Sequence, residues 1–506
     1  MLNRVPEAQW SRLSEVIAET MGLHFPSARW ADLQRGLEGA ARELGFEDTA
    51  ACVGELLSAP PTAAQIEVLA SHLTVGETYF FREKKIFDVL AADILPELVR
   101  SRRGREQRLR IWSAACCTGE EPYSLAMLLH QAIPDLADWH VTILATDINA
   151  RFLRTAAAGS YGEWSFRDTP MGIKERYFQR AGDGRYAILP EIRKLVNFAH
   201  LNLVEDVYPS LATDTNAMDV IFCRNALMYF TPSHARKAIR NLHHALVEGG
   251  SLVVSPSEAS HALFPQFLAV NFPGVILYQK SDAKLRTEQR WTPAPLSETA
   301  EFVAPATETP LPWAPPVPVA WPPEPAPALP AKEPAQTETL PTPGAMAESL
   351  YRQGRYAEAA DILRAAIDQH ASEPAAFSLL ARALANQGNL AEALAWCRRW
   401  IAADKLDPAA HYLRAVVLLE EGDPEQARTS PQRALYLQPD FVLAHFGLGN
   451  LARGRGKRDE SQRHFANALH LLGRYQPNDL LPESDGLTAG RLTETITAMT
   501  DMETAP

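Results

Sequence analysis

Cysteine is scarce in this chain of 506 residues, and its spacing favours neither a metal site nor a disulfide framework. The five cysteines, an odd number, stand at positions 52, 116, 117, 223 and 397, and no pair has the spacing of metal ligands. Reduced thiols and no bound metal are therefore expected. The adjacent Cys116 and Cys117 are interpreted as small residues packed at the end of a strand.

Long apolar runs and an excess of positive charge are also missing. No stretch approaches the roughly 20 apolar residues that a membrane-spanning helix needs, and the N-terminal residues lack the apolar core of a signal peptide. The 49 Lys and Arg face 61 Asp and Glu, a net charge of −12, which argues against a nucleic-acid-binding surface. We predict a cytoplasmic protein with no membrane insertion, which does not prevent it from acting on a membrane receptor.

The length allows about three domains, and the first part of the chain is predicted to be helical. Residues 1–72 place Leu33, Leu37 and Leu44 at helical spacing, and Pro60–Pro61 break the chain before a further short helix over 63–72. A small helical N-terminal domain over 1–72 is the resulting prediction.

The most informative stretch covers residues 109–130, where an apolar run ends in small residues and a Thr-Gly-Glu-Glu turn precedes a second apolar run. This order predicts a buried strand, a tight turn and a helix of a doubly wound sheet. A phosphate-binding loop would offer glycines and often a lysine, whereas Glu120 and Glu121 suit a cationic or hydroxyl-bearing ligand. S-adenosylmethionine (SAM) is such a ligand. The alternative is that both glutamates only favour the helix dipole.

Polar residues also end two further predicted strands. The apolar run 141–146 ends at Asp147, where nucleotide-binding sheets hold ribose hydroxyls, although a helix N-cap is the alternative. The run 218–223 ends at Arg224 and Asn225, which would lie over the ligand crevice at the carboxyl ends of the strands. These strand ends together describe an adenosine-type pocket.

Other runs complete the predicted sheet. A Gly-Asp-Gly turn joins short extended runs at 176–178 and 186–188, which predicts a small β insertion over about 160–195. Strands are also expected at 196–203, at 252–254 after a Gly-Gly pair, and at 275–278, so that the sheet closes near residue 280.

Five segments, in order, resemble the motifs of the CheR family: TVGETYFFRE (74–83), WSAACCTGEEPYSLAM (112–127), ATDIN (145–149), FAHLNL (198–203) and IFCRNALMYF (221–230). The resemblance covers roughly residues 10–282. Members of this family are SAM-dependent methyltransferases that esterify glutamates of bacterial chemoreceptors. The resemblance therefore implies a methyltransferase domain over 73–282, SAM as methyl donor, S-adenosylhomocysteine as product, a chemoreceptor cytoplasmic domain as substrate, and an N-terminal helical domain that covers the active site.

The resemblance also implies roles for individual residues. Arg82 and Tyr229 match residues beside the transferred methyl and are the predicted catalytic residues, with a core aromatic as the alternative for Tyr229. The cofactor-binding residues that it implies are Gly76, Thr78, Arg82, Glu121, Asp147, Asn202, Leu203, Arg224 and Asn225. Asn202 matches a residue at the adenine, with a turn asparagine as the alternative. Gly76 departs from the family, which more often has asparagine there, so one side-chain contact to the cofactor is absent.

The expected chemistry explains why no His–carboxylate base stands out in these motifs. A glutamate side chain, with a pKa near 4.3, is already a carboxylate at neutral pH. The enzyme must align and desolvate it rather than deprotonate it. A cation and an aromatic ring suffice for that, and His200, which lies inside a motif, is expected to be structural.

The second half of the chain begins with a change in composition. Residues 283–343 hold 16 of the 38 prolines, which predicts a Pro-rich disordered linker. Beyond it a glycine recurs every 34 residues, with small residues at fixed offsets: Gly354, Gly388, Gly422 and Gly456. This is the period of tetratricopeptide (TPR) repeats, and four units over 344–475 predict a helical solenoid with a concave face for an unknown protein partner.

Two departures and a tail complete the prediction. Pro431 is expected to interrupt the second helix of the third repeat, and Trp400 is bulky where a small residue is expected. The polar residues 476–506, with one helix at 487–499, would cap the solenoid or remain loose.

The predicted fold is thus multidomain α/β: a helical N-terminal domain, a doubly wound SAM-binding sheet with a β insertion, a linker and a TPR solenoid. The predicted function is SAM-dependent methylation of chemoreceptor glutamates, with the TPR module binding or regulating a partner. The alternative is a SAM-binding scaffold with little catalysis that recruits partners through its repeats. A methyltransferase acting on small molecules or RNA is disfavoured by the lack of a basic patch.

Overall fold

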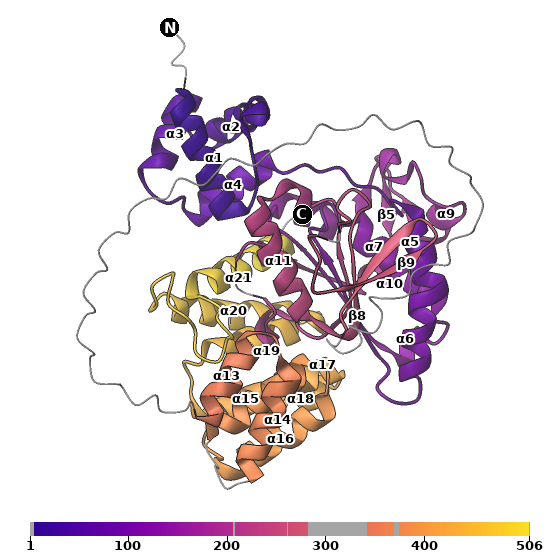
Figure 1. Cartoon of the computed structure of the whole chain (residues 1–506), viewed down its shortest axis with the longest axis vertical. Helices are drawn as coiled ribbons and strands as arrows, with labels where there is room; N and C mark the ends of the chain where they lie inside the picture. The colour runs from indigo at the N-terminus through magenta and orange to yellow at the C-terminus, as the bar shows by residue number, and fades with distance from the viewer. Residues whose placement is uncertain (1–4, 206–207, 261, 282–341, 369–373, 505–506) are drawn as a thin grey trace, which may run out of the picture.

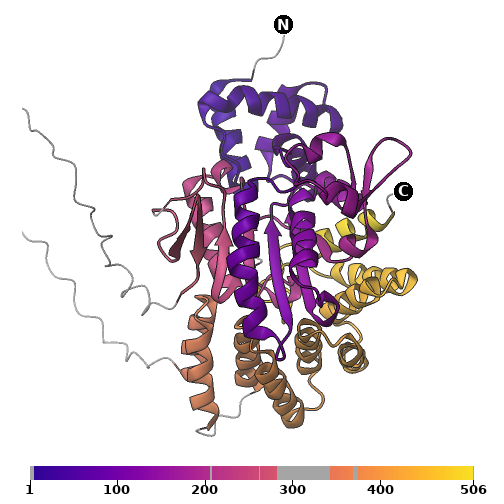
Figure 2. The same ribbon diagram turned by 90° about the vertical axis from the view of Figure 1, so that its right-hand side faces the viewer.

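A computed structural model describes residues 5–205, 208–260, 262–281, 342–368 and 374–504. The predicted linker lies outside these residues except for Thr342 and Pro343, which begin the first helix of the C-terminal part. Helices of the N-terminal part lie on one side of a central sheet, and the C-terminal helices lie on the opposite side (Figures 1 and 2).

The N-terminal part is helical, as the sequence predicts. Its helices are α1 (Glu7–Met21), α2 (Trp30–Glu43), α3 (Thr49–Ser58) and α4 (Ala63–Leu73). Their apolar faces enclose a core in which Leu13, Leu33 and Leu37 are fully buried. The side chain of Thr62 caps α4 reciprocally with Gln65, so the helix begins just after the proline pair.

The central sheet has seven strands among the described residues, in the order β6-β2-β1-β7-β8-β10-β9. Their bounds are β1 (Arg108–Ala114), β2 (His140–Asp147), β6 (Val196–His200), β7 (Met218–Cys223), β8 (Leu246–Val253), β9 (Leu268–Phe272) and β10 (Val275–Gln279). The first five strands in this order are parallel, and β10 runs antiparallel to both of its neighbours, β8 and β9. The apolar strands are buried because helices cover both faces of the sheet.

The helices of the sheet domain are α5 (Lys84–Val89), α6 (Leu95–Arg102), α7 (Glu120–Ala132), α8 (Ala150–Ala158) and α11 (Pro232–Ala245). The insertion forms a three-stranded antiparallel sheet from β3 (Ser160–Tyr161), β4 (Phe178–Arg180) and β5 (Tyr186–Ile188), flanked by α9 (Ile173–Tyr177) and α10 (Pro190–Arg193). Two local predictions were wrong. Arg176 and Tyr177 end helix α9 rather than begin a strand, and the Gly249–Gly250 pair lies within β8.

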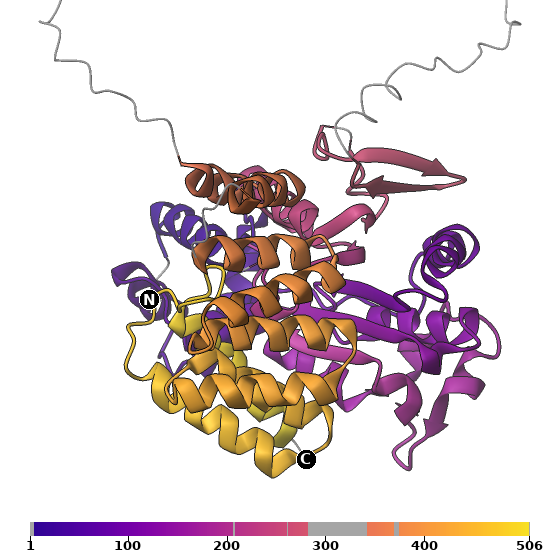
Figure 3. The same ribbon diagram turned by 90° about the horizontal axis from the view of Figure 1, so that it is seen from below.

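The C-terminal part consists of helical hairpins stacked side by side (Figure 3). In the described residues they are α13 (Pro343–Arg352) with α14 (Tyr356–Asp368), α15 (Pro374–Asn386) with α16 (Leu390–Ala403), α17 (Pro408–Glu421) with α18 (Pro424–Leu437), and α19 (Val442–Gly454) with α20 (Arg458–Leu472). The glycine of the 34-residue period closes every hairpin with a positive φ between 71° and 89°. Helix α18 continues through Pro431, so the expected interruption is absent, and Trp400 is buried in the core of the solenoid.

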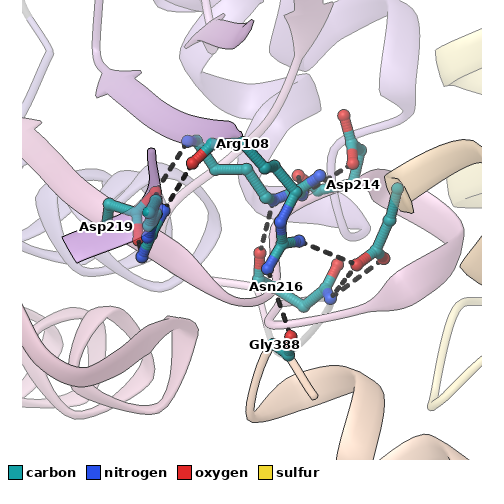
Figure 4. A network of polar contacts seen from close by, with 8 residues as sticks. Arg108, Asp214, Asn216, Asp219 and Gly388 are labelled. Atoms are coloured by element: carbon teal, nitrogen blue, oxygen red, sulfur yellow. Dashed lines mark hydrogen bonds and ion pairs between the residues drawn. The ribbon is translucent and has the colours of Figure 1, made fainter. Parts of the chain in front are cut away.

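The solenoid packs on the amino-terminal edge of the sheet, where β1 and β2 begin (Figure 4). Glu420 of α17 is buried there and accepts a hydrogen bond from Asn216 Nδ2 at 3.0 Å, and Arg108 Nη1 lies 3.7 Å from it. The Arg108 guanidinium also donates to the carbonyl of Gly388 at 3.4 Å. Burial raises the pKa of Glu420, and the nearby Arg110 and Arg108 oppose that rise. The repeats are therefore held against the sheet by buried polar contacts as well as by apolar ones.

Helix α21 (Ala489–Thr504) follows the first of the two alternatives predicted for the C-terminal tail, because it packs on the end of the solenoid, and it makes further contacts that were not predicted. It packs beside α20 and also against β6 and α8, so it covers the β6 edge of the sheet. Arg491 is buried at this contact, donates to the carbonyl of His200 at 3.1 Å and lies 3.1 Å from Glu205. The tail thus connects the solenoid to the sheet domain.

Candidate active site

A cleft with two lobes opens at the carboxyl ends of β1, β2 and β7, beneath the N-terminal helices. The larger lobe lies between the sheet and the N-terminal part, and the smaller lobe lies toward residues 75–82. The two lobes share four lining residues: Val75, Ala115, Cys117 and Asn225. We therefore describe them as one site with a wide end and a narrow end.

The turn between β1 and α7 forms the floor shared by both lobes. Ala115 and Cys117 have φ values of 61° and 52°, in the left-handed region, and Gly119 has 93°. Non-glycine residues in that region each cost about 1–2 kcal/mol, so contacts elsewhere must hold the turn. Two backbone bonds do so: Cys116 donates to the carbonyl of Thr146, and Cys117 donates to the carboxylate of Asp147, both at 2.9 Å. The turn is thereby fixed to the end of β2.

Asp147 lines the larger lobe and is buried. Its two oxygens accept separate backbone N–H groups, from Cys117 at 2.9 Å and from Asn149 at 2.8 Å. Burial raises the pKa of this carboxyl to about 6, and these backbone bonds oppose the rise. The hydroxyls of a ribose would donate hydrogen bonds to this buried carboxylate in place of water. Asp147 therefore fits its predicted role as a ribose ligand.

The smaller lobe contains a buried arginine between two carboxylates. Arg224 Nη1 lies 2.9 Å from Glu121 Oε2, and Nη2 lies 2.9 Å from Glu83 Oε2 and 2.8 Å from the carbonyl of Arg82. Ser113 Oγ donates to the other oxygen of Glu121 at 2.7 Å. Glu121 and Arg224, predicted as separate cofactor contacts, are therefore bonded to each other.

One donor of this cluster is left over. Arg224 Nε is buried and has no hydrogen-bond partner among the described residues. A buried donor without an acceptor is costly, about 1–3 kcal/mol, and a carboxylate such as that of the methionyl part of SAM would satisfy it. The lobe and its residues therefore fit the amino-acid end of this cofactor.

Arg82 and Thr78 also line the smaller lobe, and Gly76 lies close by in the same segment. The guanidinium of Arg82 donates to the carbonyl of Glu77 and lies 5.8 Å from the centre of the Tyr79 ring. A Cβ at Gly76 would come 2.8 Å from the ring of Phe152, which lines the larger lobe. Phe152 thus occupies the space that a side chain at position 76 would need.

Tyr229 lies at the larger lobe, not at the narrow end where Arg82 is. Its carbonyl accepts the N–H of His24 at 2.7 Å, and Arg29 lies 5.8 Å from the centre of its ring. Asn202 and Leu203 line the same lobe, and the Asn202 amide donates to the carbonyl of Thr20 at 2.7 Å. Asn202 is thus already bonded to the N-terminal part.

Some lining residues escaped the sequence prediction. His24, Phe25 and Arg29 come from the segment between α1 and α2, and only its docking on the sheet brings them to the cleft. No local pattern in that segment marks them. The resemblance to a family whose helical domain covers the active site was the one available signal.

The buried side chains beside the cleft are structural. Glu120, with a pKa raised by burial, accepts hydrogen bonds from Thr118 at 2.7 Å and Ser165 at 3.0 Å and lines neither lobe. His200 contacts the carbonyl of Ile148 at 2.8 Å, and burial, followed by the charge of Arg491, lowers its pKa to about 3. A histidine that stays neutral at physiological pH agrees with the expected structural role.

Comparison with known protein families gives matches in both halves of the chain. The family model described as "CheR methyltransferase, SAM binding domain" matches residues 76–270, and tetratricopeptide repeat models match 345–408 and 408–430. Among the described residues no helix is long and apolar enough to cross a membrane, and no cluster of His, Cys, Asp and Glu could hold a metal ion.

Several curated proteins are similar to the first half of the chain. Chemotaxis protein methyltransferase 1 of Pseudomonas aeruginosa is 39% identical over 219 residues, 42% of this chain and 77% of that protein. Chemotaxis protein methyltransferase Cher2 of Pseudomonas putida is 35% identical over 234 residues, 45% of this chain and 82% of that protein. Chemotaxis protein methyltransferase 2 of Vibrio cholerae is 36% identical over 195 residues, 38% of this chain, and the matched segment spans 66% of it, just under two thirds.

Solved structures match about a quarter of the chain. The structure of MamA is 21% identical, with a TM-score of 0.25, and the match covers 26% of this chain and 78% of MamA. A thermophilic TPR protein of Thermus thermophilus is 22% identical, with a TM-score of 0.24, over 26% of this chain and 72% of that protein.

Proposed function

This chain belongs to the CheR family of SAM-dependent chemotaxis methyltransferases, and we propose that it methylates glutamate side chains of a chemoreceptor cytoplasmic domain. The observation that carries the proposal is the two-lobed cleft, in which a buried ribose-type acceptor and a charged narrow end meet at one turn. We also propose that it acts in the cytoplasm, where its five cysteines would stay reduced.

Different residues of the cleft would contact different parts of the methyl donor. Asp147 would hold the ribose hydroxyls in the larger lobe, next to Asn202 and Leu203 at the adenine. Glu121 and the free Nε of Arg224 would hold the ammonium and carboxylate of the methionyl part. The bound donor supplies a methyl group on a positively charged sulfur, for which a carboxylate is a sufficient nucleophile.

The protein's task in the transfer is electrostatic and geometric. Arg82 presents a cation at the narrow end, where it would attract and orient the glutamate carboxylate of the substrate. Arg224 cannot take that role because Glu121 and Glu83 already neutralise it. Tyr229, in the larger lobe, and the N-terminal helices would exclude water from the reacting groups.

The experiment is transfer of tritiated methyl from SAM to receptor-containing membrane fractions, with the label scored as base-labile ester. Arg82→Ala should lower transfer by at least 100-fold while the affinity for S-adenosylhomocysteine changes less than threefold. Arg167→Ala is the matched control, because Arg167 stacks on the same Tyr79 ring at 3.9 Å but lines neither lobe. It should retain transfer within about twofold.

Two results would contradict the proposal. Near-normal transfer by Arg82→Ala would remove that residue from the mechanism. Tight binding of S-adenosylhomocysteine by the unmodified chain, without transfer to any receptor fraction, would favour the SAM-binding scaffold instead.

A further inference from the structure

The inner face of the solenoid is covered by other parts of the same chain. The first helices of three hairpins make polar contacts there: Tyr351 and Arg382 lie 3.3 Å and 2.8 Å from the carboxylate of Asp485, and Glu420 binds Asn216. Asp485 belongs to the loop before α21, and Asn216 to the loop before β7. The concave face that repeat proteins commonly offer to partners is thus already in contact with this chain.

A groove remains open on another side of the solenoid, between α16, α17 and α18. It has a volume of about 640 Å³, and its wall includes four cationic side chains: Arg398, Lys405, Arg414 and Arg433. None of the four forms an ion pair with a carboxylate in the part of the chain that the structure describes. Ile401 and Ala402 add an apolar strip. This groove is cationic although the chain as a whole carries a net charge of −12.

The sequence of the third repeat explains why the groove exists. TPR repeats have a leucine before the small residue of their first helix, and the equivalent Leu380 and Leu448 of the neighbouring repeats are buried. In the third repeat this position is Arg414, which is only partly buried. Arg414 Nη1 donates to Ser430 Oγ at 2.8 Å, and both residues line the groove. A core leucine has thus been replaced by a charge that has no carboxylate partner among the described residues.

We propose that this groove binds an acidic peptide segment of a protein partner, one that carries at least two carboxylates beside an apolar side chain. Arginine guanidinium groups bind carboxylates through paired hydrogen bonds, and three of them line one groove. The volume exceeds what a single small anion needs, and the apolar strip favours a chain with side chains. The inference goes beyond the proposed methyl transfer, and it assigns a chemistry to the partner that the sequence predicts for the TPR module.

The test is fluorescence anisotropy with the full-length chain and a fluorescein-labelled peptide of alternating glutamate and leucine. Arg398→Glu combined with Arg433→Glu should weaken binding at least tenfold, and raising the salt concentration should weaken binding to the unmodified chain. Arg399→Glu is the matched control, because Arg399 is the exposed neighbour of Arg398 but stacks on Trp396 outside the groove. It should stay within twofold.

A second variant distinguishes loss of the binding groove from loss of folding. Arg414→Leu restores the leucine of the repeat pattern, so it should weaken peptide binding at least fivefold while it keeps or raises the melting temperature. Binding of S-adenosylhomocysteine, at the opposite edge of the sheet, should be unchanged in every variant. Because no methyl transfer is measured, failure here leaves the proposed transfer reaction untouched.

Three outcomes would overturn the proposal. The first is that the unmodified chain fails to bind the peptide. The second is that the groove variants bind the peptide as well as the Arg399→Glu control does. Alternatively, inorganic phosphate or pyrophosphate displaces the peptide at concentrations below those of the peptide itself, in which case the groove is a phosphate site.

Discussion

The Asp147 carboxylate has two roles: it accepts backbone hydrogen bonds that hold the turn, and it is proposed to bind the ribose of the methyl donor. Replacing Asp147 by asparagine tests the second role. In the structure one oxygen accepts the N–H of Cys117 and the other accepts that of Asn149, and the residue lines the larger lobe. Asparagine has a single carbonyl oxygen, so its amide nitrogen must face one of these N–H groups or the lobe. The change therefore removes an acceptor without changing the size of the side chain.

The size of the effect follows from those contacts. A hydrogen bond to a charged group contributes about 1.5–3 kcal/mol, so loss of the ribose contact should weaken binding of S-adenosylhomocysteine by about 10- to 150-fold. The N–H group that loses its acceptor costs about 1–3 kcal/mol of stability. Removing a buried charge offsets that cost, because burial raises the pKa of Asp147 to about 6, so the variant should fold.

The assay is isothermal titration calorimetry with S-adenosylhomocysteine on the full-length chain between pH 5 and pH 8. The ionised carboxylate is the form that accepts ribose hydroxyls. The affinity of the unmodified chain should therefore rise as the pH increases through about 6, and Asp147→Asn should show no such rise. Glu120→Gln is the matched control, because Glu120 is a buried carboxyl near the same turn that lines neither lobe. An affinity of Asp147→Asn within threefold of the unmodified chain would show that the Asp147 carboxylate does not bind the ribose.

Two further predictions concern the contacts between the solenoid and the sheet. Gly388→Ala and Gly456→Ala both place a Cβ at a positive φ, 79° and 71°, but the first would also lie 2.9 Å from Arg108 Nη2 whereas the second has open space. Gly388→Ala should thus lower the free energy of unfolding by at least about 1 kcal/mol more than Gly456→Ala in urea titrations, and equal effects would contradict the docking contact. Arg491→Ala removes two contacts to His200, at 2.9 Å and 3.1 Å, so it should lower the free energy of unfolding by about 2–4 kcal/mol. It should also weaken binding of S-adenosylhomocysteine severalfold, and a variant unchanged in both measurements would show that α21 does not support the site.

The sequence predicts the sheet well wherever a strand is an apolar run bounded by a polar residue. Strand β2 ends at Asp147 and β7 ends before Arg224, so the strand ends that matter for the site follow from hydrophobicity alone. The TPR hairpins follow from the glycine period for a similar reason, because every turn needs a residue with positive φ. These features depend on local chemistry, which a single sequence records.

Features that depend on docking could not be predicted in this way. Arg29 reaches the larger lobe because Leu23 pairs with Phe230 in a short bridge between the N-terminal part and the sheet. The pairing of Glu121 with Arg224 joins residues 103 positions apart. Helix α21 covers the β6 edge through Arg491, which no periodicity marks as an interface residue. Each of these is a tertiary contact between elements whose own sequences fit several arrangements.

We propose that the two-lobed cleft holds the methyl donor in one orientation, with its sulfur at the turn between the lobes. The decisive measurement is a crystal structure of the full-length chain with S-adenosylhomocysteine bound. We expect the ribose hydroxyls within hydrogen-bond distance of Asp147 and the amino-acid end beside Glu121 and Arg224, with Arg82 facing the sulfur. A nucleoside bound outside this cleft, or bound in it with the two ends exchanged, would contradict the account.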